Sequence, residues 1–298
     1  MPDQTRITLL DGGTGRELKR IGAPFRQPEW SALSLIEAPA YVTRVHAAYV
    51  AAGADVITTN SYAVVPFHIG EDRFKSDGAR LATLAGRLAR EVADGAGRGV
   101  TVAGSLPPIC GSYRADWFDA TFARPILATL VDALRPAVDH WQAETLSAIE
   151  EAELVREVVG NDGKPLWLSF TLADDDYETK TGEPRLRSGQ SVVDAAVAAD
   201  RLGAEAILFN CSQPEVMAPA IDLARATRPA LRVGVYANAF APMKESAEAN
   251  AQLHEIRADL TPPGYVAWMR DWVARSATIV GGCCGIGPEH IAALRAAL

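Results

Sequence analysis

Residues 206–236 read AILFNCSQPEVMAPAIDLARATRPALRVGVY, and this stretch holds one complete repeat of the pattern that decides the fold. An apolar run at 206–210 is followed by an amphipathic segment at 214–226, and a second apolar run follows at 232–236. Short apolar runs that alternate with helical periodicity are typical of βα units. The stretch therefore predicts a strand, a helix and a second strand parallel to the first.

The same alternation continues along the whole chain. Strands are predicted at residues 7–11, 55–60, 100–104, 140–144, 166–171, 206–210, 232–236 and 278–281. Helices are predicted at residues 41–52, 78–93, 125–138, 146–159, 192–202, 214–226, 262–274 and 288–298. Several of these helices begin with a proline, which suits a first helical turn. Eight strands, each followed by a helix, predict a closed (β/α)8 TIM barrel in preference to a doubly wound sheet.

Composition limits the class of protein and its partners. The chain has 298 residues without a linker or a composition break, so we expect one barrel domain over residues 1–298. A net charge of −8 disfavours nucleic acid or an anionic membrane surface as a partner. The sequence begins without a signal-peptide pattern, and it has no apolar run of about 20 residues. We expect a cytoplasmic protein that acts on small molecules, and a homo-oligomer stays possible.

Polar residues collect where the predicted strands end. The carboxyl ends of parallel barrel strands meet at one face, and active sites are built there. We therefore expect one cavity to be formed by residues that are distant in sequence. The candidates are Asp11, Gly12, Thr59, Asn60, Glu144, Cys211, Asn238, Cys283 and Cys284.

Two kinds of segment around this face need an interpretation. The glycines of residues 11–15 (DGGTG) lack the order of a dinucleotide or Walker motif, so we expect them to allow a tight turn and the close approach of a ligand. Long polar stretches at 173–191 and 240–260 follow the fifth and seventh strands. They are interpreted either as lids over the site or as ordinary surface loops.

Three of the four cysteines lie at predicted strand ends. Cys211 ends the sixth strand, and Cys283 and Cys284 follow the eighth, between glycines that let the backbone turn sharply. Three thiolates with a fourth position open are typical of a catalytic zinc site. The spacing is not that of a zinc ribbon, so buried inert cysteines and a vicinal disulfide or redox pair remain alternatives at this point.

Five stretches together carry a resemblance to a known family. They are LLDGGTGRELKRIG at 9–22, GADVITTNSY at 53–62, AETLSAIEEA at 143–152, LFNCSQPE at 208–215 and IVGGCCGIGPEHI at 279–291. In this combination the chain resembles the homocysteine S-methyltransferase family, which includes enzymes that use S-methylmethionine or betaine and the homocysteine module of cobalamin-dependent methionine synthase.

The resemblance implies a zinc-bearing (β/α)8 barrel in which Cys211, Cys283 and Cys284 hold the metal. It implies that Asp11 and Glu144 bind the amino-acid end of homocysteine. The expected reaction transfers a methyl group from a cationic donor, S-methylmethionine or a similar sulfonium, to the homocysteine thiol and gives methionine. Two further residues are expected either to bond the homocysteine carboxylate or to cap strand ends, namely Thr59 and Asn60. Cys110 matches no ligand position of the family.

Two segments depart from the family pattern, and they leave the methyl donor open. After the third strand the chain reads GSLPPICGSYRADW at 104–117, and residues 236–239 read YANA where the family has a proline after the tyrosine. The aromatic faces expected for a cationic donor are those of Tyr62, Tyr113 and Trp117, each of which also suits ordinary packing. Rival readings are a betaine donor, another thiol or selenol acceptor, a non-catalytic barrel that binds zinc or senses thiol oxidation, and a metal-free barrel lyase.

Overall fold

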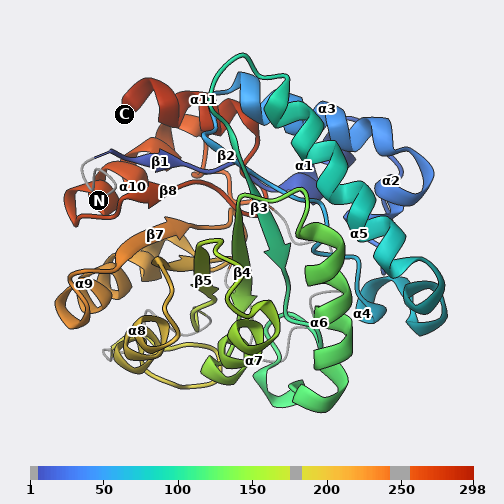
Figure 1. The fold of residues 1–298 in the computed structure, drawn as a ribbon. Helices are drawn as coiled ribbons and strands as arrows, with labels where there is room; N and C mark the ends of the chain where they lie inside the picture. Colours follow the sequence, from blue (N-terminus) through green and yellow to red (C-terminus); the bar gives the residue numbers. More distant parts are fainter. Residues whose placement is uncertain (1–5, 175–182, 242–255) are drawn as a thin grey trace.

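The computed structural model describes residues 6–174, 183–241 and 256–298. Eight parallel strands form a central barrel, and the helices surround it (Figure 1). The strands are β1 Thr8–Leu9, β2 Val56–Thr58, β3 Thr101–Leu106, β4 His140–Leu146, β5 Leu166–Phe170, β6 Ala206–Asn210, β7 Arg232–Tyr236 and β8 Ile279–Val280. All eight lie at the predicted places, although β1, β2 and β8 are shorter than predicted.

The sheet closes on itself to form the barrel. Its order is β1-β8-β7-β6-β5-β4-β3-β2, and every pair is parallel. A parallel bridge between Leu10 and Val56 joins the two ends of this order. Beside it, the Asp55 amide donates to the Leu9 carbonyl oxygen at 2.7 Å. The predicted (β/α)8 TIM barrel is confirmed, so all strand carboxyl ends lie on one face.

The helices follow the strands in the expected order. They are α1 Thr14–Arg20, α2 Ser31–Glu37, α3 Pro39–Ala51, α4 Pro66–Ile69, α5 Glu71–Asp94, α6 Ala120–Leu134, α7 Ile149–Val159, α8 Val192–Arg201, α9 Met217–Thr227, α10 Pro262–Ala274 and α11 Pro288–Ala297. Short 3-10 turns at Ala115–Trp117 and Pro214–Val216 precede α6 and α9. All eight predicted helices are present; α10 has the predicted bounds, and the other seven have one or both ends shifted. The helices α1, α2 and α4 were not predicted, because each is only four to seven residues long.

Two helix starts differ from the prediction for visible reasons. The proline predicted to open the helix at 125 lies inside α6, because Asp119 caps that helix and its carboxylate accepts from the Thr121 and Phe122 amides. Leu146, predicted to begin a helix, belongs to β4. The β4–β5 register shifts between Ala143 and Leu146, so the strand continues beyond the irregularity and α7 starts only afterwards.

The two long loops are described only in part. Antiparallel bridges join Leu172 to Leu186 and Phe240 to Ile256, so the ends of both loops lie close together. Residues 175–182 and 242–255 lie outside the described residues, and so does the central part of each predicted lid. Within the part of the chain that the structure describes, no helix has the length and apolar character that crossing a membrane requires.

Candidate active site at the carboxyl ends of the strands

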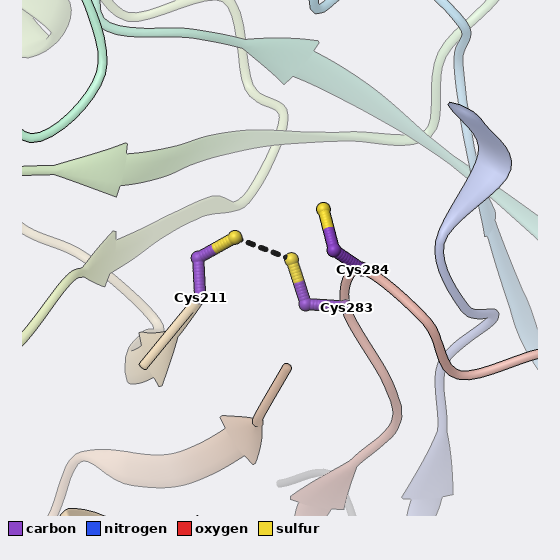
Figure 2. A group of neighbouring side chains, drawn as sticks. All are labelled: Cys211, Cys283 and Cys284. Carbon is purple, nitrogen blue, oxygen red and sulfur yellow. Dashed lines mark hydrogen bonds between the residues drawn. The ribbon is translucent and has the colours of Figure 1, made fainter. Parts of the chain in front are cut away.

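Three thiols meet where β6 and β8 end. Cys211 follows β6, and Cys283 and Cys284 follow β8 (Figure 2). The three sulfur atoms lie within 4.8 Å of one another, and the Cys211 and Cys283 sulfurs are 2.7 Å apart. A disulfide requires about 2.05 Å, and all three cysteines are free thiols. The barrel therefore gathers thiols that are 72 residues apart in the chain.

The electrostatics of this cluster favour one thiolate. Hydrogen bonds from Cys211 and Cys283 lower the pKa of Cys284 well below its usual range, and the nearby Arg16 guanidinium acts in the same direction. The pKa of Cys283 is raised well above its usual range, because its thiol is a donor to its neighbours and is buried. The cluster therefore favours a thiolate at Cys284, and the thiolate is the form in which cysteine binds a metal ion.

The donor set fits a zinc ion. Zinc binds thiolates at about 2.3 Å, so sulfurs around one tetrahedral ion lie about 3.8 Å apart. The sulfur–sulfur distances of the cluster, which range from 2.7 Å to at most 4.8 Å, include that value. The Cys211 and Cys283 sulfurs would have to move apart by about 1 Å to bind one ion. Three protein sulfurs would leave a fourth ligand position of a tetrahedral ion open, as in catalytic zinc sites.

Asp11 and Glu144 face the same pocket from β1 and β4. Asp11 accepts from the Thr58 amide at 2.8 Å and from the Thr58 hydroxyl at 3.0 Å. Glu144 accepts from the Ser105 hydroxyl at 2.5 Å and from the Tyr236 hydroxyl at 3.3 Å. Burial raises the pKa of each carboxyl to about 7, although these hydrogen bonds act against the rise. Asp11 is buried and Glu144 is half-buried, and within the described residues neither carboxyl forms an ion pair with a lysine or an arginine. The two carboxyls therefore form a site suited to a ligand ammonium group.

The remaining sequence candidates divide between the pocket wall and its support. Gly12, Thr59 and Asn60 all line the pocket. The Thr59 hydroxyl, however, accepts from the Ser105 amide at 3.0 Å, and the Asn60 amide group donates to the Ser31 carbonyl at 3.1 Å. Both residues therefore also tie neighbouring segments together, and their contact with the homocysteine carboxylate stays a prediction.

Asn238 lies behind the pocket. Asn238 is not among the described residues that line the pocket, and its side chain is fully buried. The Asn238 side-chain oxygen accepts from the Phe240 amide at 3.1 Å, which shapes the turn that brings Phe240 to the pocket wall. Direct substrate contact by Asn238 stays a prediction.

Aromatic rings line one side of the pocket. Tyr62 and Tyr113 are part of the lining. Trp117 packs against Phe67 at a ring-centroid distance of 6.2 Å and carries the Arg114 guanidinium 3.8 Å over its ring. One face of Trp117 is therefore already covered by a cation of the protein. Cys110, as expected, is not part of the sulfur cluster.

Comparison with known proteins agrees with this arrangement. Residues 8–298 match the family model described as homocysteine S-methyltransferase. The chain belongs to the homocysteine S-methyltransferase family. It is 30% identical to the homocysteine S-methyltransferase of Escherichia coli strain K12, over 99% of this chain and 96% of that protein. It is 26% identical to a selenocysteine methyltransferase of Astragalus bisulcatus, over 96% and 90% of the two chains.

A solved structure of the family has the same fold. The metallated form of the homocysteine methyltransferase from Escherichia coli superimposes with a TM-score of 0.78 at 28% identity, over 97% of this chain and 96% of that one. The metal in that crystal structure belongs to the relative. The present chain therefore shares its barrel fold with a homocysteine methyltransferase whose structure has been solved.

Backbone strain marks the site in this homocysteine S-methyltransferase family member, and sequence reasoning missed it. Five non-glycine residues in the described ranges have a positive φ, and four of them line the pocket. The four are Trp30 at 49°, Tyr113 at 67°, Thr145 at 61° and Cys211 at 52°. Non-glycine residues rarely adopt this left-handed backbone region. At functional sites, the surrounding structure holds such residues in their strained conformation. Local sequence carries no signal for it, because none of these residues is glycine or asparagine.

Proposed function

We propose that this protein is a zinc-dependent enzyme that transfers a methyl group from a small sulfonium donor, such as S-methylmethionine, to the thiol of homocysteine and so forms methionine. The observation that supports this most is the convergence of three thiols and two carboxyls on one pocket. These residues come from four different strand ends, so the proposal treats residues 1–298 as one functional barrel domain.

The three cysteines would hold the metal. When bound by Cys211, Cys283 and Cys284, zinc would keep the substrate thiol in its reactive thiolate form at neutral pH. A bound zinc would lower the pKa of the substrate thiol so that its proton passes to water, and the protein would then need no separate general base at the sulfur. The lowered pKa of the Cys284 thiol supports this role, because a thiolate is the form that binds a metal ion.

Asp11 and Glu144 would orient the acceptor. Their carboxylates can share the ammonium group of homocysteine. The positive charge of that group would offset the cost of holding two negative charges away from water. Holding that end of the substrate fixes the direction of its sulfur relative to the cysteine cluster. Loss of either carboxylate is then expected to raise KM for homocysteine more than it lowers kcat.

The charge of the pocket favours a cationic donor. Three cysteine sulfurs and two carboxylates give the pocket a negative character once a divalent ion and a thiolate substrate are bound. Tyr62 and Tyr113 line the pocket, and a sulfonium or a quaternary ammonium could contact the ring of Tyr62 and the face of Tyr113 that Arg187 does not cover. A selenol acceptor is the second candidate, because the chain also aligns over nearly its whole length with a selenocysteine methyltransferase.

Metal content and product formation test the proposal together. Zinc per chain is measured in protein purified under reducing conditions, beside Cys211→Ala and Cys284→Ala, with Cys110→Ala as the matched control outside the cluster. We expect one zinc in wild type and in the Cys110 variant and a strong loss in the other two. Equal metal content in all four proteins would disprove the assignment.

The donor and acceptor are tested in the same preparations. Methionine formation from homocysteine is followed with S-methylmethionine, S-adenosylmethionine and betaine as donors, and selenocysteine replaces homocysteine in a parallel series. Turnover with a sulfonium and homocysteine is expected. Turnover with betaine alone would correct the donor, and turnover with the selenol alone would correct the acceptor. Bound zinc without any turnover would favour a non-catalytic, thiol-sensing barrel.

A further inference from the structure

A buried ion pair lies behind the sulfur cluster, on the loop that follows β5. The Arg187 guanidinium contacts the Asp174 carboxylate at 2.6 Å, and the side chains of these two residues are 4% and 0% exposed. Most other ion pairs of the described residues lie at the surface, where they contribute little. Burial of both charges is costly unless their remaining hydrogen bonds are made, so the partners of this pair indicate its role.

The first set of partners belongs to the segment that begins with Cys211. The second carboxylate oxygen of Asp174 accepts from the Gln213 amide at 3.0 Å. The Gln213 side chain in turn donates to the Asp174 carbonyl at 3.0 Å. Asp174 thus holds Gln213, which lies two residues after Cys211, through both its backbone amide and its side chain.

A second set runs through Thr171. The Arg187 Nε donates to the Thr171 hydroxyl at 3.3 Å, and that hydroxyl lies 3.1 Å from the Ser212 hydroxyl. Ser212 also accepts from the Leu172 amide at 2.8 Å. The residue next to Cys211 is therefore fixed to the same loop by side-chain hydrogen bonds.

The third connection leads to the sulfur cluster. The Arg187 guanidinium carbon lies 4.8 Å from the centre of the Tyr113 ring. Tyr113 and Cys211 line the same pocket, and the Tyr113 side chain acts on the pKa of the Cys211 thiol. Arg187 thus stacks on a ring beside the cysteine cluster, and the backbone of Tyr113 is itself in the left-handed region, at a φ of 67°.

Cys211 needs such support because its own conformation is unfavourable. Its φ of 52° is one that non-glycine residues rarely adopt unless the surroundings hold it. This conformation turns the Cys211 side chain from the end of β6 toward Cys283 (Figure 2). Without restraint at residues 212 and 213, the backbone would relax and carry the sulfur away from the other two.

We propose that the Asp174–Arg187 ion pair is a positioning device that holds Cys211 in its left-handed turn, in register with Cys283 and Cys284. In relation to zinc this rests on the proposed function, whereas the placement of the Cys211 sulfur is a property of the protein alone. Outer partners that orient metal ligands typically account for 10–100-fold in metal affinity.

The test uses Asp174→Asn, which keeps the shape of the side chain and removes its charge, and Arg187→Lys, which keeps the charge but loses the planar fork. Arg201→Gln is the matched control, since it breaks an ion pair with Glu153 in which both side chains are about half exposed. Zinc affinity is measured by competition with a chromophoric chelator. We expect the zinc Kd to rise about 10–100-fold in Asp174→Asn, less in Arg187→Lys, and not in Arg201→Gln.

A second readout needs no metal. The reduced, zinc-free proteins are alkylated with iodoacetamide, and the rates at Cys211 and Cys283 are followed by mass spectrometry. In Asp174→Asn we expect the ratio of the Cys211 rate to the Cys283 rate to change several-fold, because only Cys211 loses its restraint. A general loosening would change both rates alike and would overturn the proposal, as would an unchanged ratio together with an unchanged zinc Kd.

Removing one buried charge can prevent folding, so a double variant completes the design. Asp174→Asn with Arg187→Gln removes both charges, which avoids an unpaired buried ion. The same loss of zinc affinity and the same change in the alkylation ratio are expected, and wild-type values in this variant would overturn the proposal. If wild type binds no zinc, the proposed function fails, while the alkylation ratio still decides the positioning of Cys211.

Discussion

The side chain of Asn210 is bound to Thr145 by two hydrogen bonds across the barrel face. The Thr145 amide donates to the Asn210 side-chain oxygen at 2.9 Å, and the Asn210 amide group donates to the Thr145 hydroxyl at 3.0 Å. Glu144 precedes one partner and Cys211 follows the other. The pair therefore fixes a substrate-binding candidate relative to a candidate metal ligand, and it explains why an asparagine precedes the cysteine.

Replacing Asn210 by alanine is expected to lower both stability and turnover. The variant leaves the buried Thr145 amide without its acceptor, which costs about 2 kcal/mol of the free energy of unfolding. Urea denaturation measures this loss, and methionine formation measures the turnover. Asn161→Ala, at an exposed position, is the control. A stable Asn210→Ala protein with full activity would show that the two hydrogen bonds are not needed.

Ligand binding at Asp11 is expected to release protons near neutral pH. Burial raises its pKa from the ordinary 3.8 to about 7, so the free protein holds a proton there that an ammonium ligand displaces. Affinity for methionine, whose thioether is a weak zinc ligand, should therefore rise with pH through about 7. Calorimetry in two buffers with different ionisation enthalpies counts the protons. Asp11→Asn should reduce the release, and an equal release in both proteins would contradict the expectation.

The same raised pKa has a consequence for stability. Between about pH 4 and pH 7 the folded protein binds more protons at Asp11 than the unfolded chain does, so this group lowers stability as the pH rises through that window. The free energy of unfolding of Asp11→Asn is expected to fall less over the window than that of wild type. Asp72→Asn, at an exposed position of α5, should behave like wild type.

Gly12→Ala is expected to destabilise the fold before it affects binding. A Cβ at this position would lie 2.2 Å from the Ile286 carbonyl oxygen and 2.9 Å from the Tyr49 ring. That oxygen already accepts from the Gly13 amide and the Tyr49 hydroxyl, so it cannot move freely. We expect the free energy of unfolding of Gly12→Ala to be lower than that of wild type by about 3 kcal/mol. Gly99→Ala, where a Cβ meets nothing within 4 Å, is the control. Thermal unfolding of both variants decides the matter.

Asp55 offers a change that should separate stability from activity. Its carboxylate accepts from the Leu9 amide at 3.0 Å and from Arg295 at 2.6 Å, at the amino-terminal end of the barrel. Asp55→Ala is expected to lower the free energy of unfolding by about 2 kcal/mol and to leave KM unchanged, because the site lies at the opposite face. Asp94→Ala, from an exposed ion pair, should change neither quantity. A raised KM in Asp55→Ala would indicate coupling between the two ends.

The parts of the structure that repeat could be predicted from the sequence, because they follow from apolar periodicity. The barrel and the meeting of Cys211, Cys283 and Cys284 follow from eight βα repeats and from polar residues at strand ends. The short helix α4 and the continuation of β4 to Leu146 could not be predicted in this way. They depend on a four-residue turn and on a register shift, and periodicity resolves neither.

The support of the site was beyond sequence reasoning for another reason. Arg187 and Asp174 lie in a polar stretch that has the composition of a surface loop, yet both are buried. Tertiary packing decides which acidic residue pairs with which basic residue, and the number of charges in a sequence does not indicate these pairs. The turn at Cys211 is similar, since the identity of a cysteine does not indicate a left-handed backbone.

The two shortest strands of the barrel, β1 and β8, are neighbours, and each has only two residues. Cys283 and Cys284 follow the short strand β8, whereas Cys211 follows β6, which is paired over five residues with β7. In amide-exchange terms, the seam at residues 278–286 should open at a lower free energy than the β6–β7 ladder. If the three thiols hold a metal ion as proposed, Cys283 and Cys284 would then be its more mobile ligands and Cys211 its more firmly placed one.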